Sequence, residues 1–140
     1  RDKINEVAGV HFNSVLMNWY RDGEDHISWH TDAEPELGIN PVIASVTFGE
    51  PRDFIIREND TLEKVTIPLK HGTLLIMKGK MQHFWQHSVP KRKKIKLSRK
   101  VSDKEITRIY QGSLAVSGIK NPLLNYFLSP ALNIYWKMKS

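Results

Sequence analysis

The chain has 140 residues and no cysteine, which excludes disulfides, zinc–thiolate sites and thiol nucleophiles and fits an intracellular protein. Its net charge of +6 is uneven, because residues 1–90 hold nine basic and thirteen acidic side chains, whereas residues 91–140 hold twelve and two. No run of about eighteen apolar residues is present, so no membrane contact is expected.

The first ninety residues have the pattern of short strands joined by turns. A short helix is predicted near the start, followed by an extended stretch that ends in a polar turn. Runs rich in β-branched and aromatic residues, bounded by Asn, Pro and Gly, then predict further strands. Short strands about ten residues apart indicate a mainly β fold, an antiparallel barrel or jelly roll. The predicted elements are a helix at 2–10, the extended stretch at 11–20, a turn at 21–25, and strands at 27–30, 41–48, 52–57, 64–69 and 73–77.

The remainder of the chain has a different character. Seven positive charges fall between Lys91 and Lys100, and such a run either contacts phosphates or forms a solvated loop. A helix is predicted over Ser102–Tyr110, with Glu105 in the N3 position of a capping box. The apolar stretch 121–130 is interrupted by prolines and has no period, so the sequence gives it no role.

A His-x-Asp pair is the candidate for chemistry. His30 and Asp32 lie on one face of an extended strand, whose side-chain period is two. With a distant second histidine, His87, they form a set of two imidazoles and one carboxylate that leaves three open positions on Fe(II). The spacing alone is a weak signal, since such pairs arise by chance. His83 competes with His87 for the third position, although the two share a face only on a helix. His11, His26, His71 and His83 itself are interpreted as structural.

Several spaced motifs follow one another in a fixed order between about residues 8 and 95. Together they resemble the AlkB-like dioxygenases of the eukaryotic homologue type, which repair alkylated DNA and RNA. The motifs are Asn18-Trp19-Tyr20, His30-Thr31-Asp32-Ala33-Glu34, the segment Pro41–Gly49, Arg52-Asp53-Phe54, the segment Ile67–Met77 and Trp85-Gln86-His87-Ser88-Val89-Pro90.

The resemblance implies a double-stranded β-helix, or jelly roll, that uses Fe(II), 2-oxoglutarate and O₂. It implies that His30, Asp32 and His87 bind the iron and that no further catalytic residue is needed. The expected reaction is oxidative demethylation of 1-methyladenine or 3-methylcytosine type bases in DNA or RNA, with release of succinate, CO₂ and formaldehyde. A monomer in the nucleus or the cytoplasm is expected.

The same resemblance assigns four further side chains. Asn18 and Tyr20 match residues that hydrogen-bond the carboxylates of 2-oxoglutarate. Glu34 matches an acidic residue that contacts the exocyclic amine of the damaged base, and Arg52 matches a cation near the base and its phosphate. The structural alternatives are a turn residue for Asn18, a core aromatic for Tyr20 and a surface charge for Arg52.

One family motif is missing where it is expected. Family members follow the distal histidine with Arg-x-Asn-x-Thr-x-Arg, whose first Arg holds the far carboxylate of 2-oxoglutarate as a bidentate pair. The favoured substitute here is Arg108, which is followed by Ile109, and Lys94 is the alternative. The sequence therefore predicts a partial jelly-roll core over residues 1–109 and a segment of unknown structure over residues 110–140.

The predicted core also has little chain in front of it. About twenty residues precede Asn18, too few for the lid that family members place over the flipped base, so we interpret the chain as a fragment or an aberrant gene model. Two other functions stay open: an inactive nucleic-acid-binding fragment that uses the run from Lys91 to Lys100, and a dioxygenase of protein or lipid, since the fold does not fix the substrate.

Overall fold

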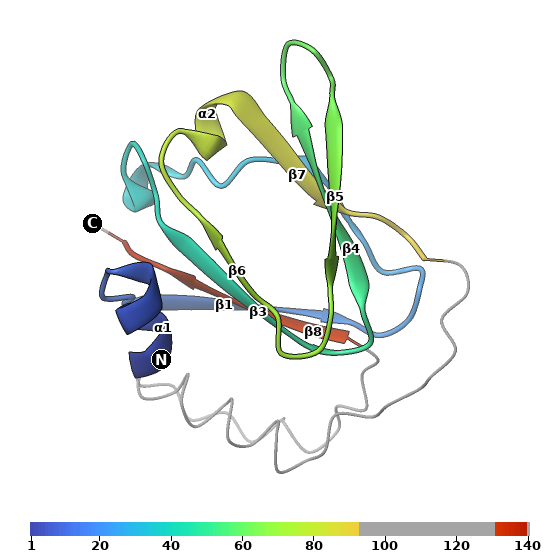
Figure 1. Ribbon diagram of the computed structural model, residues 1–140, viewed down its shortest axis with the longest axis horizontal. Helices are drawn as coiled ribbons and strands as arrows, with labels where there is room; N and C mark the ends of the chain where they lie inside the picture. The colour runs from blue at the N-terminus through green and yellow to red at the C-terminus, as the bar shows by residue number, and fades with distance from the viewer. Residues whose placement is uncertain (93–130, 140) are drawn as a thin grey trace.

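Two antiparallel sheets of four strands make up the structure, a computed structural model that describes residues 1–92 and 131–139 (Figure 1). The first sheet has the order β1-β8-β3-β6, and the second has the order β2-β7-β4-β5. In the first sheet the strands are β1 (Ser14–Tyr20), β8 (Ala131–Lys137), β3 (Ile43–Gly49) and β6 (Leu74–Met77). In the second they are β2 (Ile27–His30), β7 (Trp85–Val89), β4 (Arg52–Glu58) and β5 (Lys64–Leu69).

The sheets are held together by apolar side chains from all eight strands, with Ile27 of β2 packed against the buried cluster. One cluster joins the two sheets, with members from β1, β3, β6 and β8 on one side and from β4, β5 and β7 on the other. Its buried members are Tyr20, Ile43, Phe54, Leu69, Met77, Val89 and Tyr135. Burial of this surface is the main source of stability for a domain of this size.

A second cluster covers the other face of the first sheet. Phe12, Ala44, Ile134 and Trp136 are its buried members, and residues of the N-terminal helix α1 (Asp2–Ala8) pack against it. The helix ends where Gly9 takes a left-handed conformation with φ of 72°. Strand β8 thus supplies side chains to both clusters, as the two-residue period of a strand requires.

The predicted mainly β jelly-roll fold and its early elements are confirmed. The predicted N-terminal helix corresponds to α1, and each strand predicted between residues 11 and 77 is present. The short helices η1 (Pro35–Leu37) and α2 (Met81–Phe84) were not expected. The helix predicted over 102–110 and most of the basic run lie outside the described residues. Within residues 1–92 and 131–139, no helix has the length and apolarity needed to cross a membrane.

Strand β8 is the part of the fold that the sequence did not predict. The sequence left residues 110–140 without a structure, yet 131–137 pair with β1 on one side and with β3 on the other. Ile134 and Trp136 are buried. These residues are therefore part of the jelly roll. The boundary proposed at residue 109 lies outside the described residues and stays a prediction.

Replacing Ile134 by Ala tests whether β8 is part of the core. The side chain is fully buried, so its truncation removes apolar contacts and leaves a cavity. We expect a loss of about 2–5 kcal/mol in the free energy of unfolding, measured by urea denaturation. Met138→Ala is the control, because Met138 follows β8 and is 41% exposed. Equal effects of the two substitutions would show that β8 does not pack as described.

Candidate metal centre

Three side chains predicted to bind a metal converge between the two sheets. His30 ends β2 and lies directly opposite His87 on β7, and their rings are 4.1 Å apart between centroids. Asp32 follows two residues later, and its Oδ2 lies 3.5 Å from Nε2 of His87. Ligand atoms of the three residues all lie within 4.8 Å of one another. The structure brings together the residues that the sequence paired across a gap of more than fifty positions.

The donor set fits a divalent transition metal. Two donors about 2.1 Å from one ion lie about 3 Å apart when they occupy neighbouring positions on it, so the ligand atoms, now within 4.8 Å of one another, need to approach by at most about 2 Å. Nδ1 of His30 lies 2.8 Å from the carbonyl oxygen of Ser28. A hydrogen bond donated there fixes the tautomer and leaves Nε2 with a lone pair for a metal.

Neighbouring residues fix the other two side chains. The ring of Phe54 stacks on the ring of His87 at 5.2 Å, and His87 is only 2% exposed. The backbone N–H of Asp32 donates to Oε1 of Gln82 at 2.9 Å, so a residue of helix α2 fixes the backbone at Asp32. Aromatic packing and a backbone hydrogen bond thus restrict movement of the proposed ligands.

A buried lysine completes the cluster. Nζ of Lys137, at the end of β8, donates to Oδ1 of Asp32 at 2.9 Å and lies 3.4 Å from Oε1 of Glu34. Burial of the Asp32 carboxyl opposes its ionisation, but hydrogen bonds from His87 and Lys137 outweigh this effect and lower the pKa of Asp32 to about 2. Asp32 is therefore a carboxylate at neutral pH.

The competing histidine lies outside the cluster. His83 is exposed, and its Nε2 pairs with Oδ1 of Asn40 at 3.0 Å. It belongs to α2, whereas His87 belongs to β7, so the two do not share one helical face. Of the two alternatives that the sequence left open, only His87 lies with His30 and Asp32.

Asn18 and Tyr20 lie on one face of β1 at the edge of the first sheet. Asn18 is half-buried and Tyr20 is 3% exposed. Both line an open cavity of about 620 Å³ that continues along the turn after β1 to Ile27. This cavity runs beside β1 and the start of β2, the strand that ends in His30.

A family model described as the 2OG-Fe(II) oxygenase superfamily matches residues 1–113. The chain belongs to this superfamily. Its cofactors are Fe(II) and 2-oxoglutarate, in agreement with the donor set of His30, Asp32 and His87.

The chain is similar to AlkB homologues in particular. It is 49% identical over 100 residues to rat "Alpha-ketoglutarate-dependent dioxygenase alkB homolog 3". The matched region covers 65% of this chain and 34% of the relative. The chain is 46% identical over 103 residues to bovine "DNA oxidative demethylase ALKBH2", covering 68% and 37%. The chain thus spans about a third of the length of these relatives.

A solved structure supports the fold of this oxygenase. "The structure of OsALKBH1" covers 92% of this chain and 49% of the other, with a TM-score of 0.58 and 18% identity. At this identity the similarity concerns the fold alone.

The two residues predicted to contact a substrate base have different surroundings. Glu34 has a side chain that is 54% exposed, and it lies beside the metal cluster through its contact with Lys137. Arg52 is 1% exposed. Glu34 is therefore accessible to a ligand near the metal, whereas Arg52 has no surface that a phosphate can reach.

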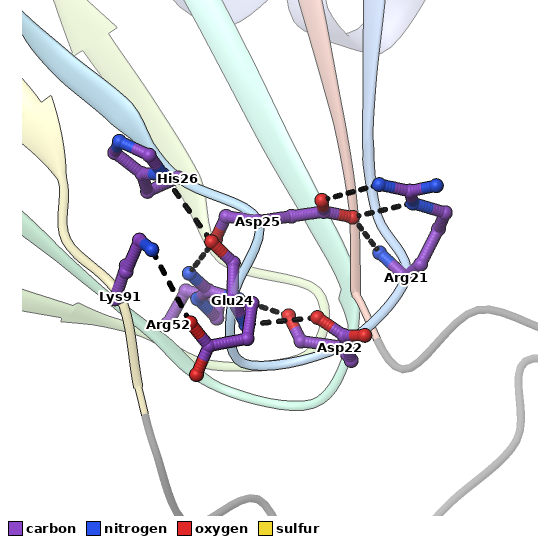
Figure 2. Close-up of polar contacts among 7 residues, drawn as sticks. All are labelled: Arg21, Asp22, Glu24, Asp25, His26, Arg52 and Lys91. Carbon is purple, nitrogen blue, oxygen red and sulfur yellow. Dashed lines mark hydrogen bonds and ion pairs between the residues drawn. The ribbon is translucent and has the colours of Figure 1, made fainter.

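Arg52 instead joins the turn after β1 to the end of β7. Its guanidinium donates to the carbonyl oxygens of Asp22, Asp25 and Pro90 at 3.1, 2.7 and 2.8 Å. It also lies 4.8 Å from the ring centre of Tyr20. Figure 2 shows the Arg52 side chain beside this turn, with its contacts to Asp22 and Asp25 dashed. Burial lowers the pKa of Arg52, and its three carbonyl contacts are those of a structural residue.

Strand β8 offers a match to the missing family motif. In Ala131–Lys137, Asn133 and Lys137 have the spacing of the Asn and the last Arg in Arg-x-Asn-x-Thr-x-Arg, while Ala131 and Tyr135 replace the first Arg and the Thr. Only Asn133 is identical to the motif, and three of its four residues are replaced, so the sequence pattern alone does not reveal the correspondence. An alanine cannot clamp a carboxylate. The predicted substitutes, Arg108 and Lys94, lie outside the described residues.

Replacing Arg52 by Met tests its structural role. The change leaves three carbonyl oxygens without their donor, so we expect the free energy of unfolding to fall by about 3 kcal/mol or more. Arg21→Met is the matched control, because Arg21 forms an exposed ion pair with Asp25, and such pairs contribute about 1 kcal/mol or less. Urea denaturation measures both; a mild effect at Arg52 would contradict the structural interpretation.

The lowered pKa of Asp32 predicts a pH dependence of stability in the metal-free protein. A carboxyl whose folded-state pKa is depressed stabilises the fold above its unfolded pKa, and this stabilisation disappears as pH falls through the folded value. We therefore expect the difference in free energy of unfolding between wild type and Asp32→Asn to shrink as the pH falls from 3.8 to about 2. Urea denaturation at each pH measures it, and a constant difference would contradict the assignment.

Proposed function

We propose that this chain is the metal-binding core of an Fe(II)- and 2-oxoglutarate-dependent demethylase of N-alkylated nucleobases in DNA or RNA. The supporting observation is the convergence of His30, Asp32 and His87, with ligand atoms within 4.8 Å, between the sheets of a superfamily fold. The names of the relatives, which include a DNA oxidative demethylase, favour a nucleic-acid substrate.

The residues have distinct tasks in this proposal. His30, Asp32 and His87 hold one face of Fe(II) and leave three positions open, which a 2-oxo acid and O₂ need. When bound, the iron and 2-oxoglutarate would use O₂ to oxidise an N-linked methyl group: one oxygen atom is inserted into the methyl group, which leaves as formaldehyde, and the other enters the succinate that forms as 2-oxoglutarate loses CO₂. Asn18 and Tyr20 would orient 2-oxoglutarate through amide and phenol hydrogen bonds.

Substrate recognition would use the exposed carboxylate beside the metal. Glu34 accepts hydrogen bonds and can therefore bind the exocyclic amine of a damaged adenine or cytosine. The base must leave the helical stack to reach the cluster, and damage that weakens pairing lowers the cost of this step. Buried surroundings around His87 and Asp32 exclude bulk water on the protein side of the metal.

The remaining predictions from the sequence are part of the proposal. We infer a monomer in the nucleus or the cytoplasm and retain 1-methyladenine and 3-methylcytosine as candidate bases. In the competing binding function, the run from Lys91 to Lys100 would bind nucleic acid without a metal. Of its two described members, Lys91 pairs with the Glu24 carboxylate and Arg92 donates to the Pro51 carbonyl oxygen, so neither contact favours that function.

Activity is tested with Fe(II), 2-oxoglutarate and an oligonucleotide that contains 1-methyladenine or 3-methylcytosine. We expect formaldehyde and succinate in equal amounts. Because loss of a partner outside the metal shell typically costs about 10–100-fold, His30→Ala should reduce product by about 100-fold or more. His83→Ala is the control, since His83 is exposed and outside the cluster.

Three results separate the candidate functions. Succinate without formaldehyde indicates an oxygenase of another substrate, and a protein or lipid panel follows. Oligonucleotide binding that falls steeply with salt and persists in His30→Ala, with no product, indicates a binding module. Absence of both products in the chain extended to the length of its relatives overturns the proposal.

A further inference from the structure

The two oxygens of the Asp32 carboxylate have different partners. Its Nζ lies 2.9 Å from Oδ1, whereas Oδ2 lies 3.5 Å from Nε2 of His87. The lysine side chain is 8% exposed and the aspartate side chain 10% exposed. One oxygen is therefore paired with an ammonium group, and the other faces the proposed metal ligands.

We propose that Lys137 is a positioning residue that keeps Asp32 a one-oxygen ligand of the metal. This inference rests on the proposed metal site. A carboxylate binds a cation through one oxygen or through both. If Oδ1 were free, it could take a second position on the ion and leave two of the three that the reaction needs.

The contacts of Lys137 hold its ammonium group in place. Glu34 Oε1 lies 3.4 Å from Nζ, so the carboxylates of Asp32 and Glu34 both contact the ammonium group of Lys137. Lys137 ends β8, the strand most distant from Asp32 in sequence. Arg52 is the only other buried Lys or Arg within residues 1–92 and 131–139, and backbone carbonyls hold it. No other buried cation in this part of the chain can replace Lys137.

Lys137 also sets the charge at the site. Its positive charge lies beside the carboxylate that the metal needs, so it weakens binding of a divalent cation by Coulomb repulsion. A lysine that served only as a buried ion pair for folding would stabilise the protein without controlling the number of open positions. The two roles differ in a property of the bound metal that can be measured.

The test uses the complete chain loaded with Mn(II), an ion that favours six oxygen and nitrogen ligands. Relaxation of water protons counts the water molecules on the metal, and titration gives its affinity. We expect three waters in wild type and in Lys137→Arg. In Lys137→Met, Oδ1 is released, so we expect two waters and Mn(II) binding tighter by about tenfold.

Lys137→Gln separates the hydrogen bond from the charge. Its amide can still donate to Oδ1, so we expect three waters, while the lost charge tightens Mn(II) binding as in the Met variant. Circular dichroism and thermal unfolding show whether each variant folds. If Lys137→Met does not fold, Lys137→Leu takes its place in the water count, because it also releases Oδ1, and three waters in that variant would overturn the proposal.

The remaining outcomes are also decisive. Three waters and wild-type affinity in a folded Lys137→Met variant would leave Lys137 a purely structural role and overturn the inference. Mn(II) binding with three waters in wild type, together with no demethylated product from the chain extended to the length of its relatives, keeps the inference and rejects the demethylase function. Wild-type protein that binds no Mn(II) rejects both.

Discussion

The Asp32 carboxylate is the interaction on which the rest of the site depends. It meets His87 from β7 and Lys137 from β8, while the backbone N–H of the same residue donates to Gln82 of α2. A carboxylate buried to this degree is stable only when it is paired and hydrogen-bonded. The contacts that stabilise the buried charge of Asp32 are therefore the same contacts that orient its carboxylate toward the two histidines.

Placing these partners around Asp32 requires distant parts of the chain. Strand β8 enters the first sheet between β1 and β3, and Lys137 lies 105 positions after Asp32. Bringing such remote segments together costs chain entropy, but this cost rises only slowly with the length of the loop. Burial of Ile134 and Trp136 from β8 offsets it. The metal centre is thus coupled to the last strand, because the residue that pairs Asp32 enters with that strand.

The two residues predicted to contact the substrate, Arg52 and Glu34, differ in their exposure to solvent, which the sequence pattern did not indicate. On β4, Arg52 shares the inward face with Phe54, and the polar turn after β1 covers its guanidinium with backbone carbonyls. Glu34 lies outside regular strands and keeps half its side chain in solvent. The same resemblance suggested both roles. Accessibility separates them, and accessibility depends on which loop folds over which strand.

Sequence alone determined the elements whose signals are local. The two-residue period paired His30 with Asp32, and runs of β-branched and aromatic residues located the strands between residues 11 and 77. Spaced motifs then predicted the jelly roll and His87 as the third member of the cluster. Only the tertiary structure decided the place of β8, the burial of Arg52 and the contact between Lys137 and Asp32. Each of these depends on pairing between segments far apart in the chain, and a strand's own residues do not specify which neighbours it will have.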